Sequence, residues 1–263
     1  MRKQLLPISV SLSFFIIFSY LTYFILKYIN TLNAVEEKIL ITIIYEQVVL
    51  GMFIYLKTAV DYAIFVGRLM DKNQGIKKRL AMNIGTSLGC FFGVSLILII
   101  WSIFKEVKII MFILLLFSGM ILIGLGDNSQ EHFHDMNKNF KTPVQVFFNI
   151  TRPIVNMFTF FMPEGSMKAK TLDLKSLFIY SAILPFILGA DDLAGYMVLM
   201  SISNVFSLLI GIYLADAVID IFLFTNRKLT TKFVKNKFIS YFGAIFFIII
   251  GVLSIIKAIN IYL

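Results

Sequence analysis

The sequence predicts an all-α integral membrane protein with about seven transmembrane helices, arranged as one N-terminal helix followed by a 3+3 inverted repeat. The composition is strongly apolar, since 59% of the 263 residues are hydrophobic and 15% are charged, whereas soluble domains carry about 25% charged residues. Apolar runs of about 20 residues, the length that crosses a bilayer, recur along the chain. An acidic motif that occurs twice predicts the repeat.

The predicted spans follow from the apolar runs. They cover about 8–28, 39–66, 83–104, 108–126, 176–200, 203–224 and 238–259. Arg2 and Lys3 precede the first span, as they would in a signal peptide. Its apolar stretch is longer than a signal-peptide core, however, and no small-residue cleavage site follows. We therefore expect a retained anchor.

These spans divide the chain into four parts. Residues 1–35 form the N-terminal transmembrane anchor, and residues 36–126 form the first three-helix repeat. A cytoplasmic loop with an interfacial segment covers residues 127–175, and the second three-helix repeat covers residues 176–263. The interfacial segment is predicted because its apolar, aromatic sequence is interrupted by Pro143, Pro153 and Pro163.

The basic residues predict the orientation. With the N-terminus inside, cytoplasmic segments hold 18 of the 24 Lys and Arg residues, as expected where basic residues concentrate on the cytoplasmic side. These residues are Arg2, Lys3, Arg68, Lys72, Lys77, Lys78, Arg79, Lys138, Lys141, Arg152, Lys168, Lys170, Lys175, Arg227, Lys228, Lys232, Lys235 and Lys237. We expect a multi-pass protein in the plasma (inner) membrane of a bacterium, with its N-terminus cytoplasmic. The loops explain the net charge of +9, and no nucleic acid partner is expected.

The repeat rests on a short motif. Residues 59–65 read Ala-Val-Asp-Tyr-Ala-Ile-Phe and residues 190–196 read Ala-Asp-Asp-Leu-Ala-Gly-Tyr, so both fit the pattern A-x-D-x-A-x-aromatic. The two predicted helices that carry the motif run in opposite directions. Two three-helix units of opposite orientation, each with an acid on its first helix, are typical of an inverted repeat.

Six acids fall inside predicted spans. They are Glu46, Asp61, Asp191, Asp192, Asp216 and Asp220. A carboxylate in the bilayer is costly, so such residues usually face the bundle interior or a water-filled cavity. Lys57 lies four residues before Asp61, on the same helix face. The two form either a structural ion pair or a cation site whose lysine releases the acid when protonation changes.

The adjacent acids Asp191 and Asp192 point about 100° apart on a helix. Pro185 and Gly189, just upstream, favour a break that would expose backbone carbonyls as further ligands. The predicted helix 176–200 contains no basic residue that could neutralise either acid. A functional role for these acids is therefore favoured.

Asp216 and Asp220 are four residues apart and share a helix face, where like charges repel unless a cation or a proton intervenes. Asp220 is alternatively a helix-end residue near Arg227. Glu46 is either an outer-vestibule ligand or a solvated helix-end residue.

The resulting ligand set is rich in oxygen. We expect Asp61, Asp191, Asp192 and Asp216 to bind metal, with Lys57, Asp220 and Glu46 in supporting or proton-linked roles. Carboxylates suit hard or borderline divalent cations such as Mn²⁺, Ca²⁺ and Mg²⁺.

Other residue types offer weaker candidates. Met70, Met197 and Met200 are either soft ligands or packing, and Cys90 is expected to pack. His132 and His134, flanked by acids, are either a metal-loading or sensing site or residues without a ligand. No HExxH, GxSxG or P-loop motif occurs, so neither enzyme activity nor a bound cofactor is expected.

Several segments resemble a known family. The segments are TAVDYAIFVGRLM, which begins at Thr58, NIGTSLGCFFGV, which begins at Asn83, and GADDLAGYMVLMSISNVFSLLIGIYLADAVID, which begins at Gly189. They resemble the cadmium resistance transporters of the lysine exporter (LysE) superfamily, and the two-repeat layout is similar to its tellurium resistance TerC branch. The resemblance implies functional acids at Asp61 and Asp191. Tyr62 stands where that family often has a second acid, and Asp192 where it often has Asn.

The sequence therefore predicts a secondary transporter that exports a divalent cation of the Mn, Cd or Ca type. The cation would pass a midplane carboxylate site between the repeats, with proton antiport as the natural coupling. The alternatives are an exporter of a small organic solute such as an amino acid, and a non-transporting membrane accessory protein. The expected partners are the lipid bilayer and the cation; assembly into a homo-oligomer stays open.

Overall fold

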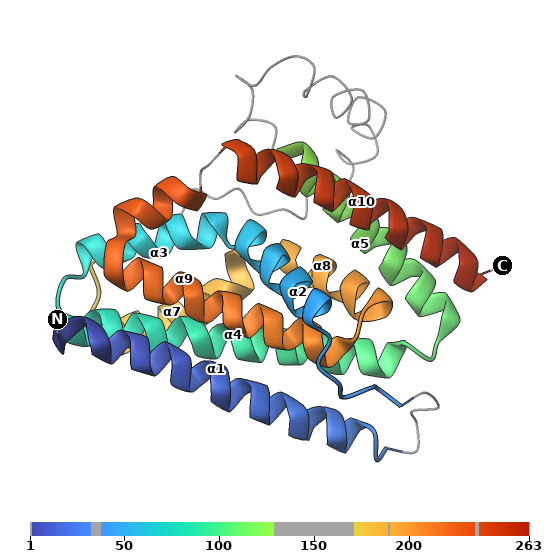
Figure 1. Ribbon diagram of the computed structural model, residues 1–263, viewed down its shortest axis with the longest axis horizontal. Coiled ribbons are helices and arrows are strands. Elements are labelled where there is room, and N and C mark those ends of the chain that lie inside the picture. Colours follow the sequence, from blue (N-terminus) through green and yellow to red (C-terminus); the bar gives the residue numbers. More distant parts are fainter. Residues whose placement is uncertain (1, 33–37, 129–170, 189, 235–236, 263) are drawn as a thin grey trace.

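The computed structural model describes residues 2–32, 38–128, 171–188, 190–234 and 237–262 (Figure 1). Within these ranges every regular element is a helix. The helices are α1 (Arg2–Ile29), α2 (Tyr45–Thr58), α3 (Val60–Lys72), α4 (Ile76–Phe104), α5 (Lys108–Asn128), α7 (Leu174–Leu188), α8 (Ala190–Ile202), α9 (Val205–Val234) and α10 (Lys237–Tyr262). The predicted interfacial segment, His132 and His134 lie outside the described residues, as does most of the predicted central loop.

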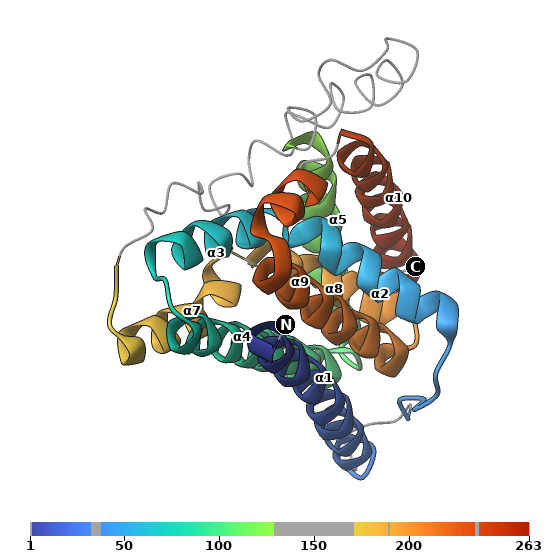
Figure 2. The same ribbon diagram turned by 60° about the vertical axis from the view of Figure 1, so that its left-hand side comes forward.

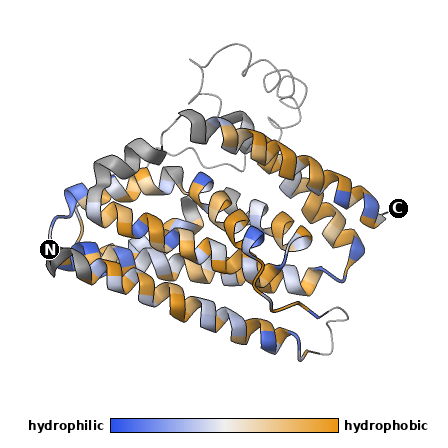
Figure 3. Ribbon diagram, in the orientation of Figure 1, coloured by the Kyte–Doolittle hydropathy of each residue, from blue (hydrophilic) through white to orange (hydrophobic). Residues whose placement is uncertain are grey.

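The helices have the composition of membrane spans. Four segments are long and apolar enough to cross a bilayer: Leu6–Ile29, Ile76–Phe104, Val205–Thr225 and Tyr241–Ile261. The pair formed by α2 and α3 is a fifth if it counts as one bent span. Figure 3 shows the apolar colouring along these helices, and many large apolar side chains are exposed on their outer faces, as a lipid environment requires. The chain is a multi-pass helical membrane protein by this criterion.

Helix α9 lies at the centre of the bundle. It contacts α1, α2, α3, α4 and α8 and is more deeply buried than the other three single spans. Figures 1 and 2 show α1 along one side of α4 and α9, and α10 beside α5 on the opposite side. Polar residues on the buried part of α9 are therefore enclosed by protein on all sides.

Three helix pairs make the most extensive contacts: α5 with α10, α4 with α7, and α2 with α9. Glycines permit close backbone approach in these pairs, as is common in membranes. A Cβ added to Gly119 of α5 would stand 2.8 Å from the carbonyl oxygen of Gly251 on α10, and the reverse distance is the same. Likewise Gly51 of α2 faces the backbone of Leu208, and Gly211 of α9 faces that of Val48.

The predicted helix 39–66 is wrong in detail. Residues 38–44 are not helical, and α2 and α3 meet at Ala59 with a bend of 58°. The Thr58 hydroxyl donates to the carbonyls of Ile54 (3.1 Å) and Tyr55 (3.3 Å). Such back-bonding competes with the helical ladder and lies directly before the bend, although Thr86 makes the same pair of bonds within the unbroken α4.

The predicted helix 176–200 is covered by α7, which ends at Leu188, and by α8, which begins at Ala190. Gly189, where a break is expected, lies outside the described residues, so that break stays a prediction. Pro185 lies inside α7, where proline removes a backbone donor and clashes with the preceding turn. The first A-x-D motif therefore coincides with the bend at Ala59, and the second begins at the first residue of α8.

The N-terminal helix is integrated into the bundle. Phe18 of α1 stacks on Phe91 of α4 at 4.5 Å between ring centroids, and Thr22 donates a 3.1 Å hydrogen bond to the Tyr213 hydroxyl of α9. Helix α1 thus packs on two core helices, whereas the sequence predicts it only as an anchor.

Candidate functional site in the helical core

Two carboxylates lie inside the bundle on α9. Asp216 is 4% exposed and Asp220 is fully buried. They are one turn apart, within the candidate span Val205–Thr225. Helix α9 continues to Val234, so Asp220 is not at a helix end, and the helix-end interpretation of this residue is wrong.

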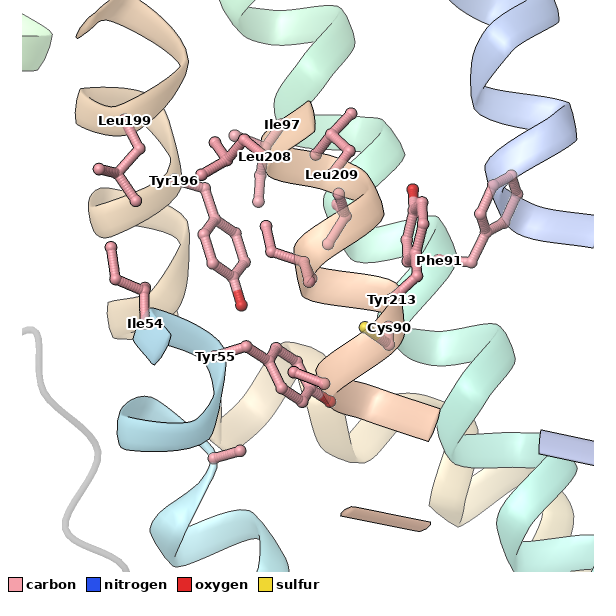
Figure 4. Close-up of a cluster of buried hydrophobic side chains, with 14 of the residues drawn as sticks. Ile54, Tyr55, Cys90, Phe91, Ile97, Tyr196, Leu199, Leu208, Leu209 and Tyr213 are labelled. Atoms are coloured by element: carbon pink, nitrogen blue, oxygen red, sulfur yellow. The ribbon is translucent and has the colours of Figure 1, made fainter. Parts of the chain in front are cut away.

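Asp216 is held from α2. The hydroxyl of Tyr55, which is 5% exposed, donates a short hydrogen bond to Asp216 Oδ1. Figure 4 shows Tyr55 near Tyr213 and Cys90, with the Tyr196 hydroxyl of α8 directed toward it. A hydrogen bond to a charged acceptor is worth about 1.5–3 kcal/mol. Tyr55 thus ties α2, just before its bend, to the acidic face of α9.

Asp220 is held from α4. Its Oδ2 accepts hydrogen bonds from Asn83 Nδ2 and from Ser87 Oγ, both at 3.1 Å. Asn83 Nδ2 also donates to Ser11 Oγ of α1 at 3.0 Å. Helices α1, α4 and α9 are therefore linked through one buried polar network.

The network leaves two acceptor oxygens without a donor. Asp220 Oδ1 and Asn83 Oδ1 are both buried and make no hydrogen bond to the described residues. The buried Tyr62 of α3 interacts electrostatically with both Asp216 and Asp220. A buried unsatisfied polar atom costs about 1–3 kcal/mol, and more when charged. A proton or a cation at these oxygens would relieve that cost.

Each hydrogen bond described for the two acids comes from a neutral group. The described donors are a phenol, an amide and a hydroxyl, and no ion pair of either acid occurs among the residues whose side chains the structure describes. Isolated buried charges are unfavourable unless they are paired, protonated or metal-bound. The arrangement can therefore accept positive charge.

The other predicted ligands are only partly placed. Asp61 is the second residue of α3, and Asp191 and Asp192 lie in the first turn of α8, but their side chains lie outside the described residues. Their predicted metal binding, and the predicted Lys57–Asp61 pair, remain predictions. Of the predicted acids, the structure places Asp216 beside Tyr55 of α2, and Asp220 beside Asn83 and Ser87 of α4.

Two supporting residues have clear surroundings. Lys57 is buried, with the aliphatic part of its side chain packed on Gly243 of α10. Glu46 is exposed in the first turn of α2. Its role as an outer-vestibule ligand remains a prediction.

The sulfur-containing residues considered as soft ligands pack in the apolar core. Met70 and Met200 are buried in the main apolar cluster, Met197 packs against it, and Cys90 is part of it. Within the described part of the chain, no group of three His, Cys, Asp or Glu residues is placed to hold a metal ion.

Sequence reasoning did not identify Tyr55, Asn83 and Ser87 as site residues. A signal was present for two of them, because Asn83 and Ser87 are four residues apart in an apolar run and so share a helix face. Tyr55 gave no signal, because one tyrosine among many aromatics is not distinctive.

Fold and site together define a multi-pass helical membrane protein with carboxylates enclosed in its core. No family model and no curated protein matches the sequence, and no solved structure matches the fold. The resemblance to the LysE superfamily therefore stands on the short motifs alone.

Proposed function

We propose that the protein is a secondary transporter that moves a divalent cation through a site that includes Asp216 and Asp220. The observation that carries this proposal is the pair of buried acids held by neutral donors, next to unpaired oxygens on Asp220 and Asn83. Two ionised carboxylates balance the charge of one divalent cation, and oxygen donors suit Mn²⁺ and Ca²⁺. Carboxylates that bind either metal or protons also provide for proton antiport.

The helix pairing supports a 3+3 inverted repeat. In such a repeat, α2–α3 corresponds to α7–α8, α4 corresponds to α9, and α5 corresponds to α10. The contact between α2 and α9 is then equivalent to the contact between α7 and α4, and the contact between α5 and α10 lies on the symmetry axis. The register that aligns Ala59-Val60-Asp61 with Ala190-Asp191-Asp192 also aligns Gly51 with Ala182. Both are small residues at equivalent contacts, since Gly51 faces α9 and Ala182 faces Gly85 and Gly89 of α4.

The bend between α2 and α3 supports a transport site between the repeats. Transporters of this type bind substrates where interrupted helices expose their ends near the middle of the membrane. Here the bend at Ala59 coincides with the motif that carries Asp61. Tyr62, next to Asp61, interacts electrostatically with the acids of α9. We propose that Asp61, Asp191 and Asp192 complete the site and that one repeat rocks against the other. We also propose a bacterial inner-membrane location with a cytoplasmic N-terminus, and export as the direction.

A flux assay tests the proposal. Proteoliposomes loaded with a metal-sensitive dye are challenged with Mn²⁺, Cd²⁺ or Ca²⁺ under pH gradients of either sign. Wild type should give a dye signal that Asp216→Asn and Asp220→Asn abolish, whereas Asp173→Asn, which changes an exposed acid just before α7, should retain it. Absence of flux for all three metals would overturn the proposal. Amino-acid flux in the same vesicles would then favour an organic-solute exporter, and no flux at all an accessory protein.

A further inference from the structure

A second site lies away from the buried acids, at the end of the bundle where α4 ends and α5 begins. It is a cavity of about 320 Å³, within the range of roughly 300–1,000 Å³ typical of ligand pockets. The lysines in its lining come from three separate parts of the chain: Lys38 before α2, Lys105 after α4, and Lys257 near the end of α10. Glu106 is the one carboxylate among the described lining residues.

The charges in this cavity favour an anion. Lys105 Nζ lies 3.2 Å from Glu106 Oε1 and 5.7 Å from the centre of the Trp101 ring. Lys257 Nζ donates to the carbonyl oxygen of Ser201. Three ammonium groups and one carboxylate give the described part of the lining a net charge of +2, which favours a phosphate group.

The wall that carries Lys38 is fixed by hydrogen bonds. Asn30 and Ile39 exchange two of them, since Asn30 Nδ2 donates to the Ile39 carbonyl at 2.9 Å and the Ile39 N–H donates to Asn30 Oδ1 at 2.8 Å. Asn204, at the turn between α8 and α9, donates to the Leu40 carbonyl at 3.0 Å. The backbone of Ile39 and Leu40, which follow Lys38, is thus held by Asn30, just after α1, and by Asn204, just before α9.

The position and the remaining lining point to a membrane lipid. Trp101 and Lys257 lie in the last turns of the candidate spans Ile76–Phe104 and Tyr241–Ile261, the level at which tryptophan and lysine mark the membrane–water interface. Leu40, Met111 and Ile261 add apolar surface beside the lysines. Basic pockets between transmembrane helices bind anionic headgroups on the cytoplasmic side of membranes, and the lysines here offer the same chemistry.

We propose that this cavity binds the phosphate group of an anionic phospholipid headgroup, with Lys38, Lys105 and Lys257 as the cationic contacts. The proposal is independent of the transport function, because it involves no residue of the α9 network. Inorganic phosphate shares the same chemistry, so the test separates the two sources.

Trp101 is the single tryptophan of the chain and lines the cavity, so intrinsic fluorescence reports directly on occupancy. The full-length protein in detergent is titrated with brominated phosphatidylglycerol, brominated phosphatidylcholine or inorganic phosphate. The anionic lipid should quench Trp101 saturably, and the zwitterionic lipid should not. If brominated phosphatidylglycerol does not quench while inorganic phosphate changes the Trp101 fluorescence saturably, the ligand is a soluble phosphate rather than a lipid.

Charge-removing variants make the test specific. Each lysine near an anionic lipid contributes enough binding free energy for about a fivefold change in affinity, so Lys38→Gln with Lys257→Gln should weaken quenching about 30-fold. Lys108→Gln, an exposed neighbour outside the cavity lining, is the matched control and should not. Lys38→Arg with Lys257→Arg should restore binding in a folded protein. Equal quenching by both lipids would overturn the proposal. So would a lipid concentration for half-maximal quenching that is the same in the Lys38→Gln, Lys257→Gln double variant as in the wild type.

Discussion

At the scale of single residues, Asp220 is satisfied on one side and not on the other. Asn83 and Ser87 donate to Oδ2, whereas Oδ1 meets no donor among the described groups. Asp216, one turn away, depends on the hydroxyl of Tyr55. Hydrogen bonds and exposure therefore distinguish two acids that a helical wheel treats as equivalent.

Removal of the Tyr55 hydroxyl tests its bond to Asp216. Tyr55→Phe should lower the free energy of unfolding by about 1.5–3 kcal/mol, because the lost partner is a charged acceptor. Tyr213→Phe is the control, since it removes a neutral hydrogen bond with Thr22 and should cost about 1 kcal/mol. Reversible unfolding in mixed micelles measures both. A larger loss for Tyr213→Phe would contradict the assignment.

The Asn83–Asp220 contact is tested by a double-mutant cycle. Asn83→Ala, Asp220→Ala and the double variant are compared for stability in the same micelles. Groups in direct hydrogen-bond contact show coupling of about 0.5–3 kcal/mol, so we expect a value in that range. Additive effects would mean that the two side chains do not interact in the folded protein.

At the scale of helices, close backbone contacts decide which helices can pair. The carbonyl oxygen of Val48 occupies the place where a side chain on Gly211 would begin, whereas a Cβ on Gly67 of α3 would meet Leu223 at an ordinary 3.9 Å. The α2–α9 pair that joins Tyr55 to Asp216 therefore depends on glycine.

Substitution of these two glycines should have opposite effects. Gly211→Ala should destabilise the protein, because the added methyl group would collide with the α2 backbone. Gly67→Ala should be neutral or stabilising by up to about 1 kcal/mol, since alanine favours the helix over glycine. Thermal unfolding followed by circular dichroism compares them. Equal melting temperatures would contradict the tight α2–α9 contact.

The extent to which the sequence predicts these elements depends on their local signals. The long apolar helices α4, α9 and α10 are found near their predicted positions, because hydrophobic runs identify spans directly. The sequence does not predict the bend at Ala59, because the hydroxyl bonds of Thr58 that precede it are those of a threonine within a long predicted span, which is not a distinctive signal. The Tyr55–Asp216 contact was not predictable, because it joins helices far apart in the sequence, and helix pairing leaves no local pattern.

At the scale of the whole molecule, the account predicts an odd number of membrane crossings. Seven spans with a cytoplasmic N-terminus place the C-terminus on the opposite side. A C-terminal alkaline phosphatase fusion should therefore be active in bacteria, and a C-terminal green fluorescent protein fusion should be dark. A fluorescent fusion with inactive phosphatase would contradict the predicted span count or the orientation.

We propose that Asp216 and Asp220 bind a cation in the core of the bundle. The most direct test is calorimetric titration of the purified protein with Mn²⁺, Cd²⁺ and Ca²⁺, in which Asp216→Asn and Asp220→Asn are compared with Asp173→Asn, a change at an exposed acid. We expect a saturable site for at least one metal that both core variants lose and the Asp173 variant keeps. Metal binding unchanged in folded Asp220→Asn, or no binding of any of the three metals to wild type, would contradict it.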